Sequence, residues 1–155
     1  MTALIKEKVI EINDTAKTDV KPKLDKLGRA YATGKRKNAI AKVWIKKGSG
    51  KIVVNDHEVL KYFGREILVN IIKAPFQATK NDNKFDVVAQ IVGGGKSGQA
   101  GALAHGISKA LVDFDYNNNH KTLRTSGFLT RDPRVVERKK YGYKKARKGK
   151  TYRKR

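Results

Sequence analysis

The sequence predicts one domain built from both strands and helices, followed by a basic tail. Its 155 residues are enough for one domain with a substantial core and too few for two large ones. Apolar residues alternate with other residues at 39–46 and again at 85–91, which is the period of half-buried strands. Between 97 and 113 apolar residues recur at helical spacing, so we expect a helix packed on the sheet.

The first 28 residues differ in composition from the rest of the chain. They contain no aromatic residue and are dense in Lys, Asp and Glu. A short helix would bring one apolar face together: Leu4, Ile5, Val9 and Ile12. Pro22 and Gly28 would stop a longer helix. We therefore predict that 1–28 is an extension, loosely ordered on its own, and that the domain covers 29–128.

The first elements of the domain are predicted from turn and capping residues. The strand at 39–46 is followed by Gly48, Ser49 and Gly50, and residues 52–54 are apolar again, which predicts a hairpin. Asn55 and Glu58 have the spacing of a capping box, which predicts a helix through Phe63.

The later elements follow from proline, glycine and periodicity. A second short helix is predicted from about 65 to 72, ending before Pro75. Gly101 and Gly106 lie inside the helix at 97–113, where each lowers helix propensity by about 1 kcal/mol relative to Ala. We therefore expect close packing there. A last helix is predicted over 120–125 and ended by Gly127, and beyond Val136 the apolar pattern is gone.

The glycine-rich stretch after the second strand matches nucleotide-binding motifs only in part. A phosphate-binding P-loop needs a glycine five residues before Gly95, where this chain has Gln90. A dinucleotide fingerprint fits 93–98, but Asp113 ends the predicted helix and no further strand follows. Two interpretations stay open: a tight strand-to-helix turn alone, or backbone N–H groups that contact a phosphate.

Other catalytic or metal-binding patterns are weak. His57, His105 and His120 form no metal-ligand motif, and the chain has no cysteine for a disulfide or thiolate site. We expect His105 to pack or hydrogen-bond rather than bind a ligand, and Trp44 to be a sheet residue rather than a stacking platform. The sequence thus predicts no enzyme activity, no cofactor and no metal.

The charge of the chain indicates a polyanionic partner. The formal net charge is +22, and residues 138–155 carry eleven of the basic side chains and no carboxylate. No apolar run reaches the roughly 18 residues of a membrane span, and no secretory signal is evident, so we expect a cytoplasmic protein. The tail at 129–155 has tyrosines among its cations but no apolar helical face, which favours RNA over DNA or a membrane. A disordered tail without a specific partner is the alternative.

Four segments resemble a known family, the ninth protein of the small ribosomal subunit in its bacterial form. They are "YATGKRKNAIAKV" (31–43), "GKIVVN" with "YFGRE" (50–55, 62–66), "GGGKSGQAGALAHGISKAL" (93–111) and "LTRDPRVVERKKYGYKKARK" (129–148). The resemblance covers about 29–155. It implies a single α+β domain, a mixed sheet with helices on one side, similar to the second domain of the fifth small-subunit protein. It further implies a place in the subunit head beside neighbouring ribosomal proteins.

The resemblance also assigns RNA contacts. Residues 34–37 match the family's basic loop, and 93–98 match its glycine loop. The residues that the resemblance places on small-subunit rRNA are Lys35, Arg36, Lys37, Gly94, Gly95, Lys96, Arg131, Arg134, Arg138, Lys139, Lys140, Lys144, Lys145, Arg147 and Lys148. Those expected to approach the peptidyl-site tRNA are Arg153, Lys154 and Arg155.

The chain departs from the family pattern at 149–153, where "GKTYR" replaces a stretch that usually carries Gln-Phe-Ser. Two other functions remain in competition with a ribosomal one. A free-standing nucleic-acid-binding protein would share the charge, and a small-molecule phosphotransferase would use the glycine loop.

Overall fold

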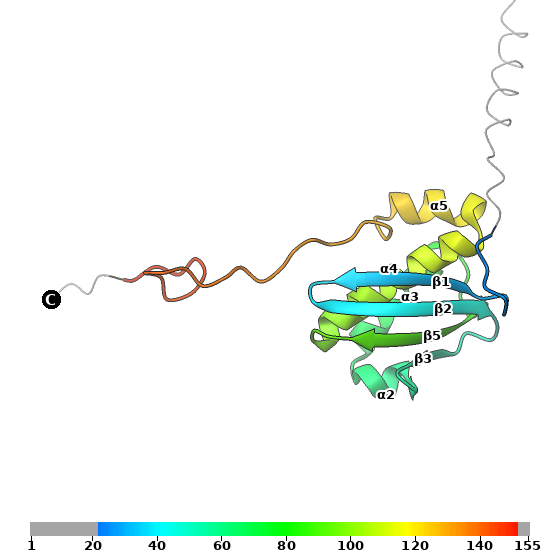
Figure 1. Ribbon diagram of the computed structural model, residues 1–155, viewed down its shortest axis with the longest axis horizontal. Coiled ribbons are helices and arrows are strands. Elements are labelled where there is room, and N and C mark those ends of the chain that lie inside the picture. The colour runs from blue at the N-terminus through cyan, green and yellow to red at the C-terminus, as the bar shows by residue number, and fades with distance from the viewer. Residues whose placement is uncertain (1–21, 152–155) are drawn as a thin grey trace, which may run out of the picture.

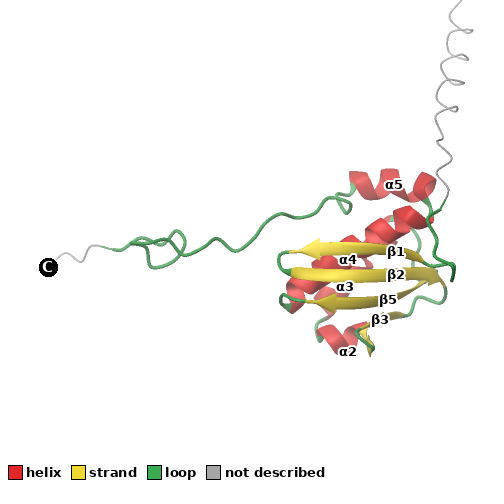
Figure 2. Ribbon diagram, viewed as in Figure 1, coloured by secondary structure: helices red, strands yellow, loops and turns green. Residues whose placement is uncertain are grey.

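A computed structural model of the protein describes residues 22–151. It contains a mixed five-stranded sheet in the order β1-β2-β5-β3-β4, with helices packed on one side (Figures 1 and 2). This confirms the expected single α+β domain. The proposed helix at the N-terminus of the chain, with Leu4, Ile5, Val9 and Ile12, lies outside the described residues. Residues 22–28 begin to contact the domain, since the Lys23 N–H donates to the Asp113 carbonyl at 2.8 Å.

The two strands predicted from alternation are confirmed, and a third precedes them. Strands β2 (Ala39–Lys47) and β5 (Phe85–Val92) pair antiparallel, and each buries every second residue. Strand β1 (Ala30–Arg36) pairs antiparallel with β2 and was not expected from the sequence. The predicted basic loop over 34–37 is therefore wrong in part, because Lys35 and Arg36 belong to this strand.

The predicted hairpin between 39–46 and 52–54 is wrong. Strand β3 (Ile52–Val54) does not pair with β2. It pairs parallel with β5, along the edge of β5 that faces away from β2, so the glycine segment crosses the end of the sheet. The Asp86 carboxylate holds this crossing, because it accepts hydrogen bonds from the backbone N–H groups of Ser49, Gly50 and Lys51. These bonds also lower the pKa of Asp86.

The predicted capping box is also wrong, although a helix does end at Phe63. Asn55 and Asp56 have positive φ and turn the chain into β4 (His57–Glu58), and helix α2 (Val59–Phe63) begins without a side-chain cap. The Asn55 side chain bonds instead across the sheet. It accepts from the Ile91 N–H at 2.8 Å and donates to the Ile91 carbonyl at 3.0 Å. The side-chain amide thus makes the same pair of bonds as the backbone of a neighbouring strand would make.

Helix α3 (Glu66–Ala78) does not stop before Pro75 as expected. Pro75 lies inside the helix and is fully buried, and Phe76 beside it belongs to the core. A proline in a helix interior removes one hydrogen bond and disfavours the helix. The burial of both side chains offsets this cost, so tertiary packing overrides the local preference.

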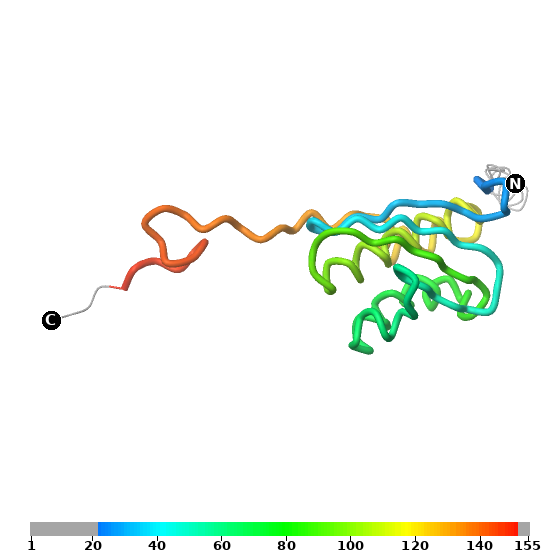
Figure 3. Tube along the Cα trace, turned by 60° about the horizontal axis from the view of Figure 1, so that its bottom comes forward, coloured from blue at the N-terminus to red at the C-terminus, as the bar shows by residue number. Residues whose placement is uncertain are grey.

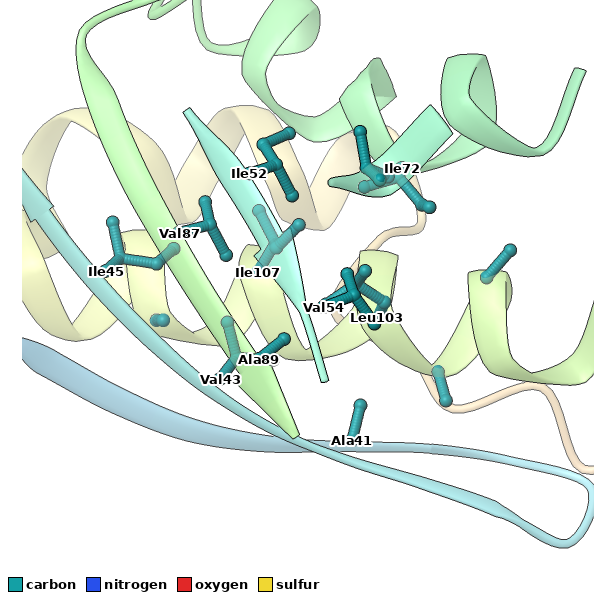
Figure 4. Packing of buried hydrophobic residues seen from close by; sticks show 14 of the residues in the cluster. Ala41, Val43, Ile45, Ile52, Val54, Ile72, Val87, Ala89, Leu103 and Ile107 are labelled. Atoms are coloured by element: carbon teal, nitrogen blue, oxygen red, sulfur yellow. The ribbon is translucent and has the colours of Figure 1, made fainter. Parts of the chain in front are cut away.

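Helix α4 (Lys96–Phe114) is confirmed and spans the covered face of the sheet, where it packs on β1 and β2. Helix α5 (Tyr116–Thr125) starts four residues before the predicted boundary, because Asp115 caps it by accepting from the Asn118 N–H. The core lies between the sheet and these helices (Figure 4). Its fully buried large side chains include Ile45, Val87, Leu103 and Ile107.

Glycine and alanine bring α4 close to the sheet, as the glycines of its sequence predicted. A Cβ atom at Gly34 would collide with the Ala102 carbonyl of α4, and one at Gly106 would lie 2.6 Å from Val43 Cγ2. None of the helices within residues 22–151 is long and apolar enough to cross a lipid bilayer.

Candidate RNA-binding surface

Three segments far apart in the sequence meet at one end of the domain. Lys37 and Asn38 form the turn between β1 and β2, Gly93–Gly98 join β5 to α4, and Val135 and Val136 follow from the start of the tail. Figure 3 shows the turn and the glycine loop side by side at the end from which the tail departs. Together these segments line a groove of about 490 Å³, which we call the glycine groove.

The first two glycines of the loop are required by the turn. Gly93 and Gly94 have φ of 72° and 65°, a conformation that residues other than glycine rarely adopt. A Cβ at Gly93 would also lie 2.5 Å from the Asn38 carbonyl oxygen. The tight turn therefore accounts for glycine at these two positions. It does not account for Gly95, which has φ of −98° and open space where a Cβ would point.

Gly95 stands at the N-terminus of α4, and the first residues of this helix line the groove. The first N–H groups of a helix have no partner within the helix and carry the positive end of its dipole. Here they belong to Lys96, Ser97 and Gly98, all of which line the glycine groove. The groove thus combines oriented N–H donors with the side chains of Lys37 and Lys96, which is the chemistry that binds a phosphate.

Tyr62 and Gln99 stabilise this arrangement and were not found from the sequence. Lys96 Nζ lies 3.4 Å from the centroid of the Tyr62 ring. The Tyr62 hydroxyl donates to Gln99 Oε1 at 3.1 Å, and Gln99 Nε2 donates to the Gly93 carbonyl at 3.1 Å. The lysine and the glycine loop are therefore held by one network. Its aromatic member comes from α2, and no local pattern connects α2 to the loop.

The three basic residues at 35–37 have three different surroundings. Only Lys37 lines the glycine groove. Lys35 is exposed on the face of the sheet that the helices leave uncovered, whereas Arg36 points to the helical side. Strand alternation separates them, because successive side chains point to opposite faces. The structure thus does not bring Lys35, Arg36 and Lys37 together.

Arg36 has a protein partner in the tail. Its side chain crosses α4 at Gly101, where a Cβ atom would collide with it, and its Nη2 donates to Asp132 Oδ2 at 3.1 Å. Arg134 also binds Asp132, through its Nε and Nη2. The hydrogen bonds from Arg134, followed by the charges of Arg134 and Arg36, hold the pKa of Asp132 well below its usual range.

His105 bonds to the backbone beside this ion pair. Its Nδ1 accepts from the Lys35 N–H at 3.3 Å, which agrees with the hydrogen-bonding role expected for it. Burial lowers the pKa of His105, and the nearby charge of Lys109 lowers it further. A neutral ring with an acceptor at Nδ1 suits this contact.

Residues 129–151 contain neither helix nor strand. Glu137 bonds to Lys140 at 2.7 Å and to Arg147 at 2.8 Å, so this part of the tail closes into a loop. Among the predicted RNA-binding cations of the tail, those that form no ion pair within residues 22–151 are Arg131, Arg138, Lys139, Lys144, Lys145 and Lys148. The predicted tRNA-binding residues Arg153, Lys154 and Arg155 lie outside the described residues.

The family of the chain follows from a comparison with known protein families. Residues 34–155 match the model of the family described as ribosomal protein S9/S16. The chain belongs to this family. The match includes the β1–β2 turn, the glycine loop and the whole tail, and it confirms the resemblance found in the sequence. The family consists of structural ribosomal proteins. Membership indicates that the chain is a component of the small ribosomal subunit in the cytoplasm.

Proposed function

We propose that the protein is a structural component of the head of the small subunit that binds rRNA through the glycine groove and the tail. The observation that carries this proposal is the meeting of Lys37, Lys96 and the first N–H groups of α4 in one groove, at the end of the domain where the tail departs. The proposal involves no catalytic activity, cofactor or metal. The rRNA contacts assigned to Lys35 and to the tail cations are part of this proposal.

The two parts of the surface suit different tasks. The glycine groove is held by packing and by the network of Tyr62 and Gln99, so it presents a fixed site for one or two phosphates. The tail carries a dense series of exposed cations without regular structure, which suits a path through folded RNA. Arg36 and Asp132 join the two and set the direction in which the tail leaves the domain.

Arg36 therefore acts in this proposal as a positioning residue. Its guanidinium is tied to Asp132 and its Nε is buried, so it is poorly placed to bind phosphate directly. This differs from the phosphate contact that the family resemblance implied. Neighbouring ribosomal proteins of the head remain expected partners.

Removal of the two groove lysines tests the rRNA-binding proposal. We expect Lys37→Gln with Lys96→Gln to weaken binding to small-subunit rRNA in filter-binding assays. The slope of log K against log salt should become shallower by roughly 1.4 to 1.8, since each lost phosphate contact removes about 0.7 to 0.9. The control, Lys61→Gln with Lys121→Gln, removes two exposed charges on α2 and α5 and should change little. Equal effects of the two pairs would refute a specific role of the groove.

Deletion of 153–155 tests the proposed contact with peptidyl-site tRNA. The domain and residues 129–152 remain, so assembly into small subunits should be nearly unaffected. Loss of the terminal cations should weaken tRNA binding to reconstituted subunits by about 1 to 3 kcal/mol, the scale of a few charge-assisted hydrogen bonds. Unchanged tRNA affinity across a salt series would exclude this contact and leave the tail as an rRNA ligand only.

A further inference from the structure

The sheet face opposite the helices carries a row of large side chains. Strand pairing places Tyr31 beside Trp44, Trp44 beside Val88, and Val88 beside Val53, so the row crosses four strands. Tyr31 and Val88 are 44% and 49% exposed, and Trp44 and Val53 are partly exposed. No helix of the described residues covers this face, which is turned toward the viewer in Figure 2.

Tyr31 and Trp44 form the centre of this row. Their ring centroids are 5.3 Å apart with an interplanar angle of 42°. The Tyr31 hydroxyl lies 3.1 Å from Thr33 Oγ1, which fixes the ring along the strand. The two aromatic rings are thus held on a stiff sheet and remain accessible to solvent.

Lysines surround the aromatic pair. Lys42 and Lys46 precede and follow Trp44 by two residues on β2, so they lie on the same face at about 7 Å on either side. Lys35 stands on β1 of the same face, and all three lysines are exposed. None of them forms an ion pair within residues 22–151.

Carboxylates on this face offset only part of the lysine charge. Asp86 is the register partner of Lys46 and offsets part of its charge, although the two form no ion pair and Asp86 Oδ1 accepts from the N–H groups of residues 49–51. Glu58 lies on the edge strand β4, at the other side of the sheet from β1. The open face is therefore positively charged around an aromatic centre.

We propose that this open face binds an unpaired segment of RNA, with a base stacked on Tyr31 and Trp44 and phosphates at Lys42 and Lys46. Aromatic side chains bordered by cations favour single strands, because unpaired bases can stack on rings whereas bases in a duplex cannot reach them. A protein partner fits less well, since interface centres are depleted of lysine. The inference adds a second contact to the proposed rRNA-binding function and rests on that function.

Trp44 gives a direct measurement, because it is the only tryptophan of the chain. We would titrate the full-length protein with a fluorescently labelled single-stranded oligoribonucleotide and with an RNA duplex of equal phosphate number. Anisotropy of the label reports total binding, including binding to the tail, and tryptophan fluorescence reports contact at the open face. We expect both RNAs to bind and only the single strand to quench Trp44.

Two matched double variants locate the contact. Lys42→Gln with Lys46→Gln should raise the RNA concentration at half-maximal quenching roughly tenfold, as expected from the loss of two phosphate contacts. Lys61→Gln with Lys121→Gln removes the same charge from α2 and α5 and should leave quenching unchanged. Circular dichroism of both variants would establish that they are folded.

Each other outcome overturns the inference. Quenching that is absent, equal for the duplex, or equally weakened by both double variants means that Trp44 does not stack on an unpaired base. If RNA binds by anisotropy without quenching, the open face fails while the proposed rRNA-binding function stands. Trp44 fluorescence that changes only on incorporation into subunits, and not with RNA, would assign the face to a neighbouring protein instead.

Discussion

Arg36 Nη2 lies 3.1 Å from Asp132 Oδ2, and this ion pair connects the end of β1 to the first residues of the tail. The contact is possible because Gly101 leaves room for the arginine side chain on the surface of α4. A strand, a helix and the tail thus meet at one point. In the proposed function, this pair sets the direction in which the tail leaves the domain.

We expect Asp132→Asn to loosen the start of the tail and to weaken rRNA binding several-fold. The substitution makes the protein more positive, so charge alone would strengthen binding, whereas loss of orientation weakens it. Asp82→Asn adds the same charge at an exposed loop and serves as the control. Heteronuclear NOE values for 130–136 should decrease only in Asp132→Asn. Tighter rRNA binding by both variants would show that the ion pair does not orient the tail.

Stability should depend on His105 between pH 7.5 and 5.5. Burial lowers the pKa of His105 in the folded state, and an unfolded histidine has a pKa of about 6.5. The unfolded state therefore takes up the proton first as the pH falls. The free energy of unfolding is then highest above about pH 6.5 and decreases below it, toward the lower pKa of the folded state.

Urea unfolding of wild type and His105→Gln at both pH values measures this effect. The decrease should be smaller in the variant. The carboxyl groups with lowered pKa, including Asp132 and Glu137, contribute mainly below about pH 5, since unfolded Asp and Glu titrate near 3.9 and 4.3. An equal decrease in both proteins would assign the acid sensitivity to other groups.

Gly34→Ala should destabilise the fold, because its Cβ would collide with the backbone of α4. We expect a loss of about 1 to 3 kcal/mol in the free energy of unfolding, the usual cost of overpacking. Gly95→Ala is the matched control, since nothing lies within 4 Å of its Cβ position. It should cost less than about 1 kcal/mol, as for a changed N-cap. Chemical denaturation would detect the difference, and equal costs would contradict the described approach of β1 to α4.

Asn55→Gly should remove the side-chain bonds to Ile91 while it keeps the positive φ accessible. Two partly buried backbone groups would lose their partners, at a cost of about 1 to 3 kcal/mol. Asn83→Gly changes another asparagine of positive φ, which is exposed, and should be near neutral. Denaturation midpoints that shift equally for the two variants would mean that the Asn55 bridge does not stabilise the sheet.

Sequence periodicity identified the large apolar strands and the longest helix but missed β1. The side chains of β1 that face α4 are Ala30, Ala32 and Gly34, which are too small to give an apolar alternation. They are small because the helix approaches closely there. The prediction of close packing from glycines in α4 was confirmed, but it was not extended to the strand that receives them.

Local signals failed where distant residues determine the conformation. Gly48 and Gly50 suit a hairpin turn, yet Asp86 of another strand holds the loop in a crossing. Asn55 and Glu58 suit a capping box, yet Ile91 binds the Asn55 side chain. Pro75 usually ends a helix, but its burial in the core keeps it within α3.

The candidate site shows the same limit. The charge of the chain and its resemblance to the family predicted that the glycine loop and the tail bind RNA. The structure brings the loop together with Lys37 and with residues 135–136 of the tail. Neither charge nor resemblance could predict the contribution of Tyr62 and Gln99, because these residues reach the loop from α2 and from within α4. The separation of Lys35 from Lys37 required knowledge that residues 30–36 form a strand.

The salt dependence of rRNA binding by the full chain and by residues 1–137 tests the central claim most directly. The truncation removes eleven cations and leaves the domain, the glycine groove and the Arg36–Asp132 pair in place. We expect weaker binding and a shallower log–log slope, reduced by about 0.7 to 0.9 for each phosphate contact that the tail makes. Equal affinity and equal slope for the two proteins would contradict the claim that the tail binds rRNA.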